Sequence, residues 1–165
     1  MNETQRVRTY TWDDPGLSAG AVADRSGLEF LKAMNTGELP PPPVMHTLGM
    51  TGVEVDGDRV VFHLEPQEFH YNPIGSMHGG VLATLLDSAA GCAVHATLPA
   101  GMAYTSLDLT VKYLRPVTVH SGTLRCEGTV LSRGSRTALA QAQVFDRKGR
   151  LVAHATSSCL IYPCT

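Results

Sequence analysis

The spacing of hydrophobic residues along the chain predicts strands on both sides of one long helix. Alternating hydrophobic and polar residues predict a hairpin of two strands, at 50–55 and 59–64, around the turn Asp56-Gly57-Asp58. A continuous run rich in Ala, Leu and Gly predicts a helix from residue 78 to about residue 97. Four further segments have the alternation typical of strands: 103–113, 121–132, 137–145 and 151–162.

The residues before the first predicted strand show a weaker pattern. Residues 1–25 are polar and Gly-rich without a clear period, so we expect a loosely attached segment there. Ser26 and Glu29 match a capping box, which predicts a short helix that ends at Gly37. The prolines at 40–43 stop that helix and predict a stiff, extended spacer.

The predicted long helix is hydrophobic around most of its circumference, which indicates that it is buried. One buried helix, with two strands before it and four after it, predicts an α+β fold in which a single antiparallel sheet wraps around the helix. Such a sheet has edges that must be covered, so we expect the protein to form dimers. We place this domain at residues 45–165 and an N-terminal extension, with the short helix and the Pro-rich spacer, at 1–44.

Composition and charge exclude several classes of function. Only 17% of the 165 residues are charged, the net charge is −2 and no basic block is present, so neither nucleic acid nor an anionic membrane is an expected partner. The most apolar window, 81–103, contains Asp87, His95 and Pro99, which argues against a membrane-spanning helix. The N-terminal residues lack the apolar core of a secretory signal, and the four cysteines form no zinc-ligand cluster. We therefore expect a cytoplasmic protein without a bound metal.

The densest chemical signal lies where the predicted long helix begins. His78-Gly79-Gly80 opens this helix, although two glycines disfavour helix formation. Free backbone N–H groups and the positive end of the helix dipole lie at a helix start, and glycine lets a ligand approach them closely. This arrangement suits the polarisation of a carbonyl oxygen. The alternative is a tight turn that packs closely against a strand.

Asp87, on the same predicted helix, is the second candidate. It lies either on a solvated face of the helix or in a site where its carboxylate acts as a nucleophile or general base. Gly79 and Asp87 are eight residues apart, which is about 12 Å along an α-helix. Asp87 therefore cannot attack a carbonyl bound at Gly79 of the same helix. If both serve one reaction, Asp87 comes from a neighbouring subunit whose helix runs antiparallel across a two-fold axis.

A larger pattern around these residues resembles the hotdog-fold thioesterases. It covers roughly residues 45–162, and the similar branch is that of the phenylacetate-pathway and related acyl-CoA thioesterases, near the Arthrobacter-type hydroxybenzoyl-CoA thioesterase. The resemblance implies hydrolysis of an acyl-CoA thioester without a cofactor, in a homodimer or homotetramer whose active sites are shared between subunits. The pattern consists of Asn72-x-x-Gly75-x-x-His78-Gly79-Gly80 with Leu86-Asp87, then Thr105-Ser106-Leu107-Asp108-Leu109 and Tyr113-Leu114-Arg115-Pro116.

The resemblance also implies roles for individual residues of the loop and helix. The Gly79 N–H would polarise the thioester carbonyl, and Asp87 of the partner subunit would attack directly or activate water. Asn72 would position the catalytic water or the loop. His78 would lie beside the thioester, near the leaving sulfur.

Two further roles follow from the resemblance and from the chemistry of CoA. Ser106, or Thr105 if the register is shifted by one residue, would hold the attacking water or the carboxylate. The phosphates of CoA favour arginine side chains and backbone N–H groups. The candidates for these contacts lie in a predicted turn and after a predicted strand: Arg133, Gly134, Arg136 and Arg115.

Two other functions stay open. A hotdog dehydratase or hydratase would act on an enoyl- or hydroxyacyl-thioester, but that branch usually relies on an Asp/His pair in a different loop motif. A catalytically silent acyl-CoA binding or sensing module would need no carboxylate beside the thioester. The presence of Asp87 with Asn72 and the His-Gly-Gly turn argues against such a module.

Overall fold

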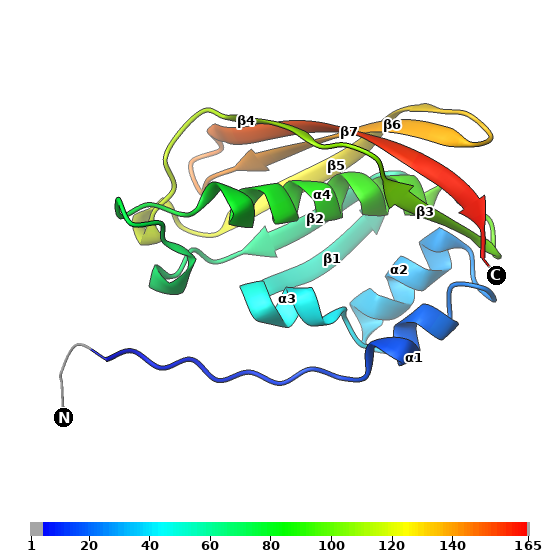
Figure 1. The fold of residues 1–165 in the computed structure, drawn as a ribbon, viewed down its shortest axis with the longest axis horizontal. Coiled ribbons are helices and arrows are strands. Elements are labelled where there is room, and N and C mark those ends of the chain that lie inside the picture. The colour runs from blue at the N-terminus through cyan, green and yellow to red at the C-terminus, as the bar shows by residue number, and fades with distance from the viewer. Residues whose placement is uncertain (1–4, 165) are drawn as a thin grey trace.

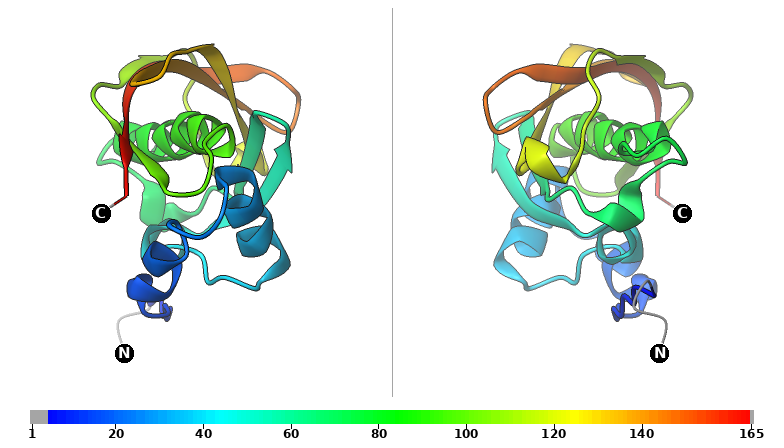
Figure 2. Two further views of the ribbon diagram at one scale, coloured as in Figure 1. Left: turned by 90° about the vertical axis from the view of Figure 1, so that its right-hand side faces the viewer. Right: turned by 90° about the vertical axis from the view of Figure 1, so that its left-hand side faces the viewer.

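The fold is a seven-stranded antiparallel sheet wrapped around one long helix, α4 (Gly79–Ala96), in a computed structural model that describes residues 5–164 (Figure 1). Six strands follow the order β1-β2-β5-β6-β7-β3, and β4 also pairs with β7. Viewed along α4, the sheet curves around the helix (Figure 2). This is the predicted α+β arrangement. The strands are β1 (Met50–Asp56), β2 (Arg59–Leu64), β3 (Met102–Ser106), β4 (Thr110–Tyr113), β5 (Leu124–Arg133), β6 (Thr137–Phe145) and β7 (Leu151–Pro163).

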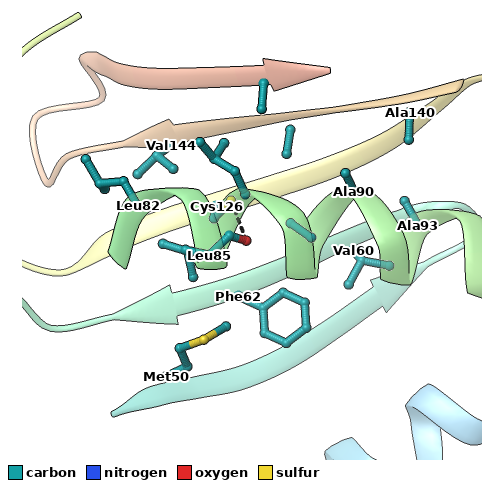
Figure 3. Packing of buried hydrophobic residues seen from close by; sticks show 14 of the residues in the cluster. Met50, Val60, Phe62, Leu82, Leu85, Ala90, Ala93, Cys126, Ala140 and Val144 are labelled. Atoms are coloured by element: carbon teal, nitrogen blue, oxygen red, sulfur yellow. Dashed lines mark hydrogen bonds between the residues drawn. The ribbon is translucent and has the colours of Figure 1, made fainter. Parts of the chain in front are cut away.

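The hydrophobic core lies between α4 and the inner face of the sheet (Figure 3). Leu85 and Ala89 of α4 are completely buried there, as the hydrophobic circumference of the helix predicts. The strand β5 passes so close to the helix that a Cβ at Gly128 would lie 2.0 Å from the Ala89 carbonyl oxygen. Glycine at this position therefore lets the sheet close tightly over α4. The helix is also long and apolar enough to cross a membrane, but here it is the core helix that the sheet covers.

Three short helices precede the sheet: α1 (Pro15–Gly20), α2 (Gly27–Thr36) and α3 (Pro43–Leu48). The capping box of α2 is confirmed, because Ser26 Oγ accepts from the Glu29 N–H and Glu29 Oε2 accepts from the Ser26 N–H. The helix ends at Gly37, which adopts a left-handed conformation with φ 78°. One expectation is wrong, because the extended spacer stops short of Pro43, which begins α3. The helix α1 forms in the segment where the sequence shows no clear period.

The N-terminal residues contact the domain that follows them. The Arg8 guanidinium donates to the backbone oxygens of His46 (2.6 Å) and Thr47 at the end of α3, and lies 4.1 Å from the centroid of the Phe69 ring. Leu31 of α2 is buried in the same core as α4. These contacts tie the described part of this segment, from residue 5 onward, to the domain that follows it, and a division of the chain at residue 44 stays a prediction.

The strand predicted at 103–113 is divided, so five strands rather than four follow α4. The break falls at Asp108, whose Oδ1 accepts from the Ser158 N–H (3.0 Å) and whose carbonyl oxygen accepts from Ser157 Oγ (2.8 Å). These bonds replace the regular ladder with β7 and separate β3 from β4. The next strand, β5, begins at Leu124 rather than at residue 121, because Val119–Ser121 forms a 3-10 turn.

Near the end of α4, His95 is 6% exposed, and its ring packs against Phe30 and Tyr104. Neither ring nitrogen has a hydrogen-bond partner within residues 5–164. Burial lowers the pKa of His95 below its ordinary value, and it lowers the pKa of His70 in the same direction. The unfolded chain therefore takes up protons below about pH 6.5 that the folded chain does not bind, and the free energy of unfolding falls as the pH falls.

We expect His95→Phe to raise the free energy of unfolding by about 1 kcal/mol, because it removes unpartnered polar atoms from an apolar environment. It should also reduce the loss of stability between pH 7 and pH 5, leaving the part that His70 contributes. Urea unfolding at several pH values checks both effects. The exposed His120→Gln is the control. An unchanged pH slope in His95→Phe would contradict this account.

Candidate active site

The loop before α4 is held together by Asn72. Its side-chain oxygen accepts from the N–H groups of Ile74 (3.1 Å) and Ser76 (3.2 Å), and its side-chain nitrogen donates to Ser76 Oγ (3.1 Å). The Asn72 N–H also donates to the Ser76 carbonyl oxygen. Gly75, with φ 85°, provides the left-handed residue that this turn requires. The hydrogen bonds of Asn72 thus lie within the loop and fix the path of the chain into α4.

His78 is the N-cap of α4, and its Nδ1 accepts from the Gly80 N–H (2.9 Å). Since Nδ1 is the acceptor, the proton of the neutral imidazole lies on Nε2. The Val81 N–H donates to the His78 carbonyl oxygen. The Gly79 N–H, by contrast, has no hydrogen-bond partner in the part of the chain that the structure describes. A free donor therefore lies at the positive end of the helix dipole.

Gly79 opens into a hollow with a volume of about 330 Å³, formed by the loop, the start of α4 and the segment after β4. Apolar side chains such as Leu82 and Val117 line it together with polar ones such as Ser76, a mixture that suits the carbonyl end of an organic substrate. Arg115, one of the candidates for CoA, lines this hollow, and its guanidinium donates to the Leu151 carbonyl oxygen. The lining residues are Asn72, Ser76, Met77, Gly79, Leu82, Tyr113, Leu114, Arg115, Pro116 and Val117.

Asp87 lies in a second, open hollow with a volume of about 380 Å³, between α4 and the break after β3. Ser106 Oγ donates to Asp87 Oδ1 (2.8 Å), so the structure brings these two predicted residues together. Thr105, the alternative, is exposed and is not among the residues that line this hollow. The hydrogen bond from Ser106 occupies Oδ1 of Asp87, and Oδ2 has no hydrogen-bond partner among residues 5–164.

The two hollows share no lining residue. Gly79 and Asp87 are therefore not brought together within one chain, as their separation on one helix requires. The turn between β5 and β6, with Arg133, Gly134 and Arg136, is also remote from Gly79, because it lies near the opposite end of α4 (Figure 1). Of the four residues suggested for CoA, only Arg115 lies beside Gly79 in a single chain.

Two residues of this region had no role assigned from the sequence. Tyr113 Oη donates to the Gly79 carbonyl oxygen (2.9 Å). His70 is buried, accepts from the Gln67 N–H at Nδ1 and donates from Nε2 to the Leu48 carbonyl oxygen, and its own carbonyl oxygen accepts from the His78 N–H. Tyr113 belongs to the Tyr-Leu-Arg-Pro motif, but its contact with Gly79 depends on long-range strand pairing that the motif does not specify.

Three of the four cysteines are poor candidates for a nucleophile. Burial raises the pKa of the Cys92 thiol to about 12, and it raises the pKa of Cys126 and Cys159 as well. At neutral pH these thiols stay protonated, whereas the thiolate is the reactive form. Within residues 5–164, no group of three or more His, Cys, Asp or Glu side chains is placed to hold a metal ion.

Comparison with known proteins identifies the family to which the chain belongs. The family model described as "Thioesterase superfamily" matches residues 74–153. A protein of Halobacterium salinarum named as an esterase is 37% identical in an alignment of 106 positions, which covers 59% of this chain and 68% of that protein. Acyl-coenzyme A thioesterase 13 of Mus musculus is 27% identical over 105 residues, which are 63% of this chain and 74% of that protein.

Solved structures agree with this assignment. A thioesterase-like protein of Ralstonia eutropha, described as related to phenylacetic acid degradation, has a TM-score of 0.71 and 31% identity, and the match covers 79% of this chain and 98% of that one. The Escherichia coli PaaI protein has a TM-score of 0.71 at 22% identity, over 86% of this chain and 99% of that one, and so shares the fold. The chain therefore belongs to the thioesterase superfamily, has the hotdog fold that the resemblance implied, and is a thioesterase.

Proposed function

We propose that the protein hydrolyses an acyl-CoA thioester to a free carboxylic acid and CoA, at sites formed by two copies of the chain. One observation carries this proposal. The unpartnered Gly79 N–H and the Asp87 carboxylate lie on the same helix, about 12 Å apart, in hollows with no common residue. Thioester hydrolysis needs a donor for the oxyanion and a carboxylate. The hollow at Gly79 holds the donor, and the hollow at Asp87 holds the carboxylate.

A two-fold axis between two copies of the chain would bring the Gly79 hollow of each copy to the Asp87 hollow of the other. If two α4 helices run antiparallel, with Asp87 of one opposite Gly79 of the other, they cross near residue 83 and form two equivalent sites. The strand β3, at the edge of the sheet, carries Ser106 beside Asp87. Because an edge strand has unpaired backbone groups, it is a natural place for the second copy to dock. We propose a homodimer as the smallest active unit, alone or within a tetramer.

In this site the thioester oxygen accepts from the Gly79 N–H, and the helix dipole stabilises the negative charge that develops on it. Asp87 of the partner subunit either attacks the carbonyl carbon, giving an anhydride that water then hydrolyses, or removes a proton from the attacking water. The C–S bond breaks, and the CoA sulfur leaves with the electron pair and takes up a proton. His78, whose Nε2 carries the proton of the neutral imidazole, donates a hydrogen bond to the leaving sulfur, and the proton that the sulfur takes up is the one released by the attacking water. The sum is thioester plus water to acid plus thiol.

The remaining candidates fit the same assembly. Asn72 acts through the loop that it holds closed, rather than through a free side chain. In the antiparallel pair, the last two turns of α4 extend past the start of the partner helix. The turn with Arg133, Gly134 and Arg136 then comes to the partner's site, where its N–H groups and guanidinium groups would contact the CoA phosphates. Arg115 would contact CoA from the Gly79 side.

Release of free thiol from a panel of acyl-CoAs of different length and with aromatic or aliphatic acyl groups tests this proposal. We expect hydrolysis of at least one member, together with binding of free CoA. Tight binding of acyl-CoA with no turnover on any member would favour the silent binding module instead. Conversion of an enoyl-CoA to a hydroxyacyl-CoA, with no thiol released, would favour the hydratase.

A further inference from the structure

The two glycines at the start of α4 each leave room for a ring. A Cβ at Gly79 would lie 3.0 Å from both Cζ and Oη of Tyr113, and a Cβ at Gly80 would lie 3.0 Å from Nδ1 of His78. Any larger residue at either position would press against the neighbouring ring. The glycines of this motif thus do more than expose N–H groups, since they also admit two side chains that pack on the first turn.

Both side chains form hydrogen bonds with the peptide group that joins Gly79 to Gly80. Tyr113 Oη donates to the Gly79 carbonyl oxygen (2.9 Å), and the Gly80 N–H donates to His78 Nδ1 (2.9 Å). Two adjacent glycines would otherwise leave this turn with the greatest backbone freedom of any sequence. The peptide between them is instead held from both sides. The Gly79 N–H, on the preceding peptide, stays unpartnered and borders the hollow that Tyr113 also lines.

The geometry points to Tyr113 as a positioning residue for the thioester carbonyl, an inference that rests on the proposed role of Gly79. Its hydroxyl holds the first peptide of α4, and its ring occupies the space beside Gly79, so that the free N–H keeps a fixed direction into the hollow. The register of β4 on β7, with Tyr113 opposite Ala153, sets where the ring lies. Tyr113 acts through Gly79 and contributes no proton or electron pair to the reaction.

Tyr113→Phe tests the hydroxyl, because it keeps the ring and removes the bond to Gly79. We expect kcat to fall about fivefold, which is the rate effect of losing the free energy of one hydrogen bond. The KM should change by less than about twofold. Tyr10→Phe is the matched control, since Tyr10 is a partly exposed tyrosine outside both hollows, and should leave both constants unchanged. A Tyr113→Phe variant with the kcat of the wild-type protein would overturn the inference.

A double-mutant cycle tests the contact itself. Gly79→Ala and Tyr113→Ala break the same packing and the same hydrogen bond, so the double variant should lose no more kcat than the worse single variant. The free energy of unfolding, measured on the same four proteins, should be non-additive in the same way. Losses that multiply in kcat and add in unfolding would overturn the inference. A wild-type protein that is active, with Tyr113→Phe equal to it, defeats this inference alone, whereas a wild type that hydrolyses no acyl-CoA defeats the proposed function and this role with it.

Discussion

Asp87→Asn should lower kcat for acyl-CoA hydrolysis by about a hundredfold to ten-thousandfold, the range for loss of a general base or nucleophile. The amide oxygen can still accept the hydrogen bond from Ser106, so the fold and the affinity for CoA should stay nearly unchanged. Steady-state thiol release and CoA binding, measured on the same preparation, check both halves of this expectation.

Asp108→Asn is the matched control for loss of a carboxylate charge in the same hollow. Asp108 Oδ1 accepts from the Ser158 N–H, and an amide oxygen can take over that bond. We expect this control to lose less than about tenfold in kcat, since it removes no reacting group. If both variants lose activity equally, the hollow needs negative charge in general and Asp87 has no special role.

Gly79→Pro should have the second large effect, because it removes the N–H that we assign to the oxyanion. Proline suits the first position of a helix, and His78 already has the extended conformation that proline requires of the residue before it. Loss of one such donor costs about a hundredfold to a thousandfold in kcat. Gly79→Ala is the control, because its Cβ meets Tyr113 in the same way but its N–H is kept.

The difference between the two Gly79 variants therefore isolates the N–H. We expect Gly79→Ala to lose about as much as Tyr113→Phe, and Gly79→Pro to lose a further factor of about one hundred. Circular dichroism and thermal unfolding identify any variant that fails to form α4. Equal activity of the two folded variants would mean that the Gly79 N–H does not polarise the substrate.

The sequence predicted the parts of the fold that are encoded locally. The apolar circumference of α4, the capping box at Ser26 and the turn at Gly57 each depend on neighbouring residues, and each is present in the structure. The division of the strand at 103–113 depends on bonds from Asp108 to residues about fifty positions later. No local pattern encodes those bonds, so the alternation of residues there predicted one strand.

In the candidate site, too, some features follow from local sequence and others depend on long-range contacts. The separation of Gly79 and Asp87 follows from helix geometry alone, and the sequence therefore led directly to the expectation of a shared site. The contact of Ser106 with Asp87 came from the resemblance, and the structure contains it. The role of Tyr113 depends on where β4 pairs with β7, which neither helix geometry nor the motif specifies.

Mixed dimers test the central proposal, a site built from two subunits, most directly. Differently tagged Asp87→Asn and Gly79→Pro chains are co-expressed, and the dimers that carry both tags are isolated. In such a dimer one site receives Gly79 from one chain and Asp87 from the other, both unaltered, while the second site has both changes. We predict that the mixed dimer recovers about half of the wild-type kcat per dimer, although each parent is nearly inactive. A mixed dimer no more active than its parents would contradict the shared site.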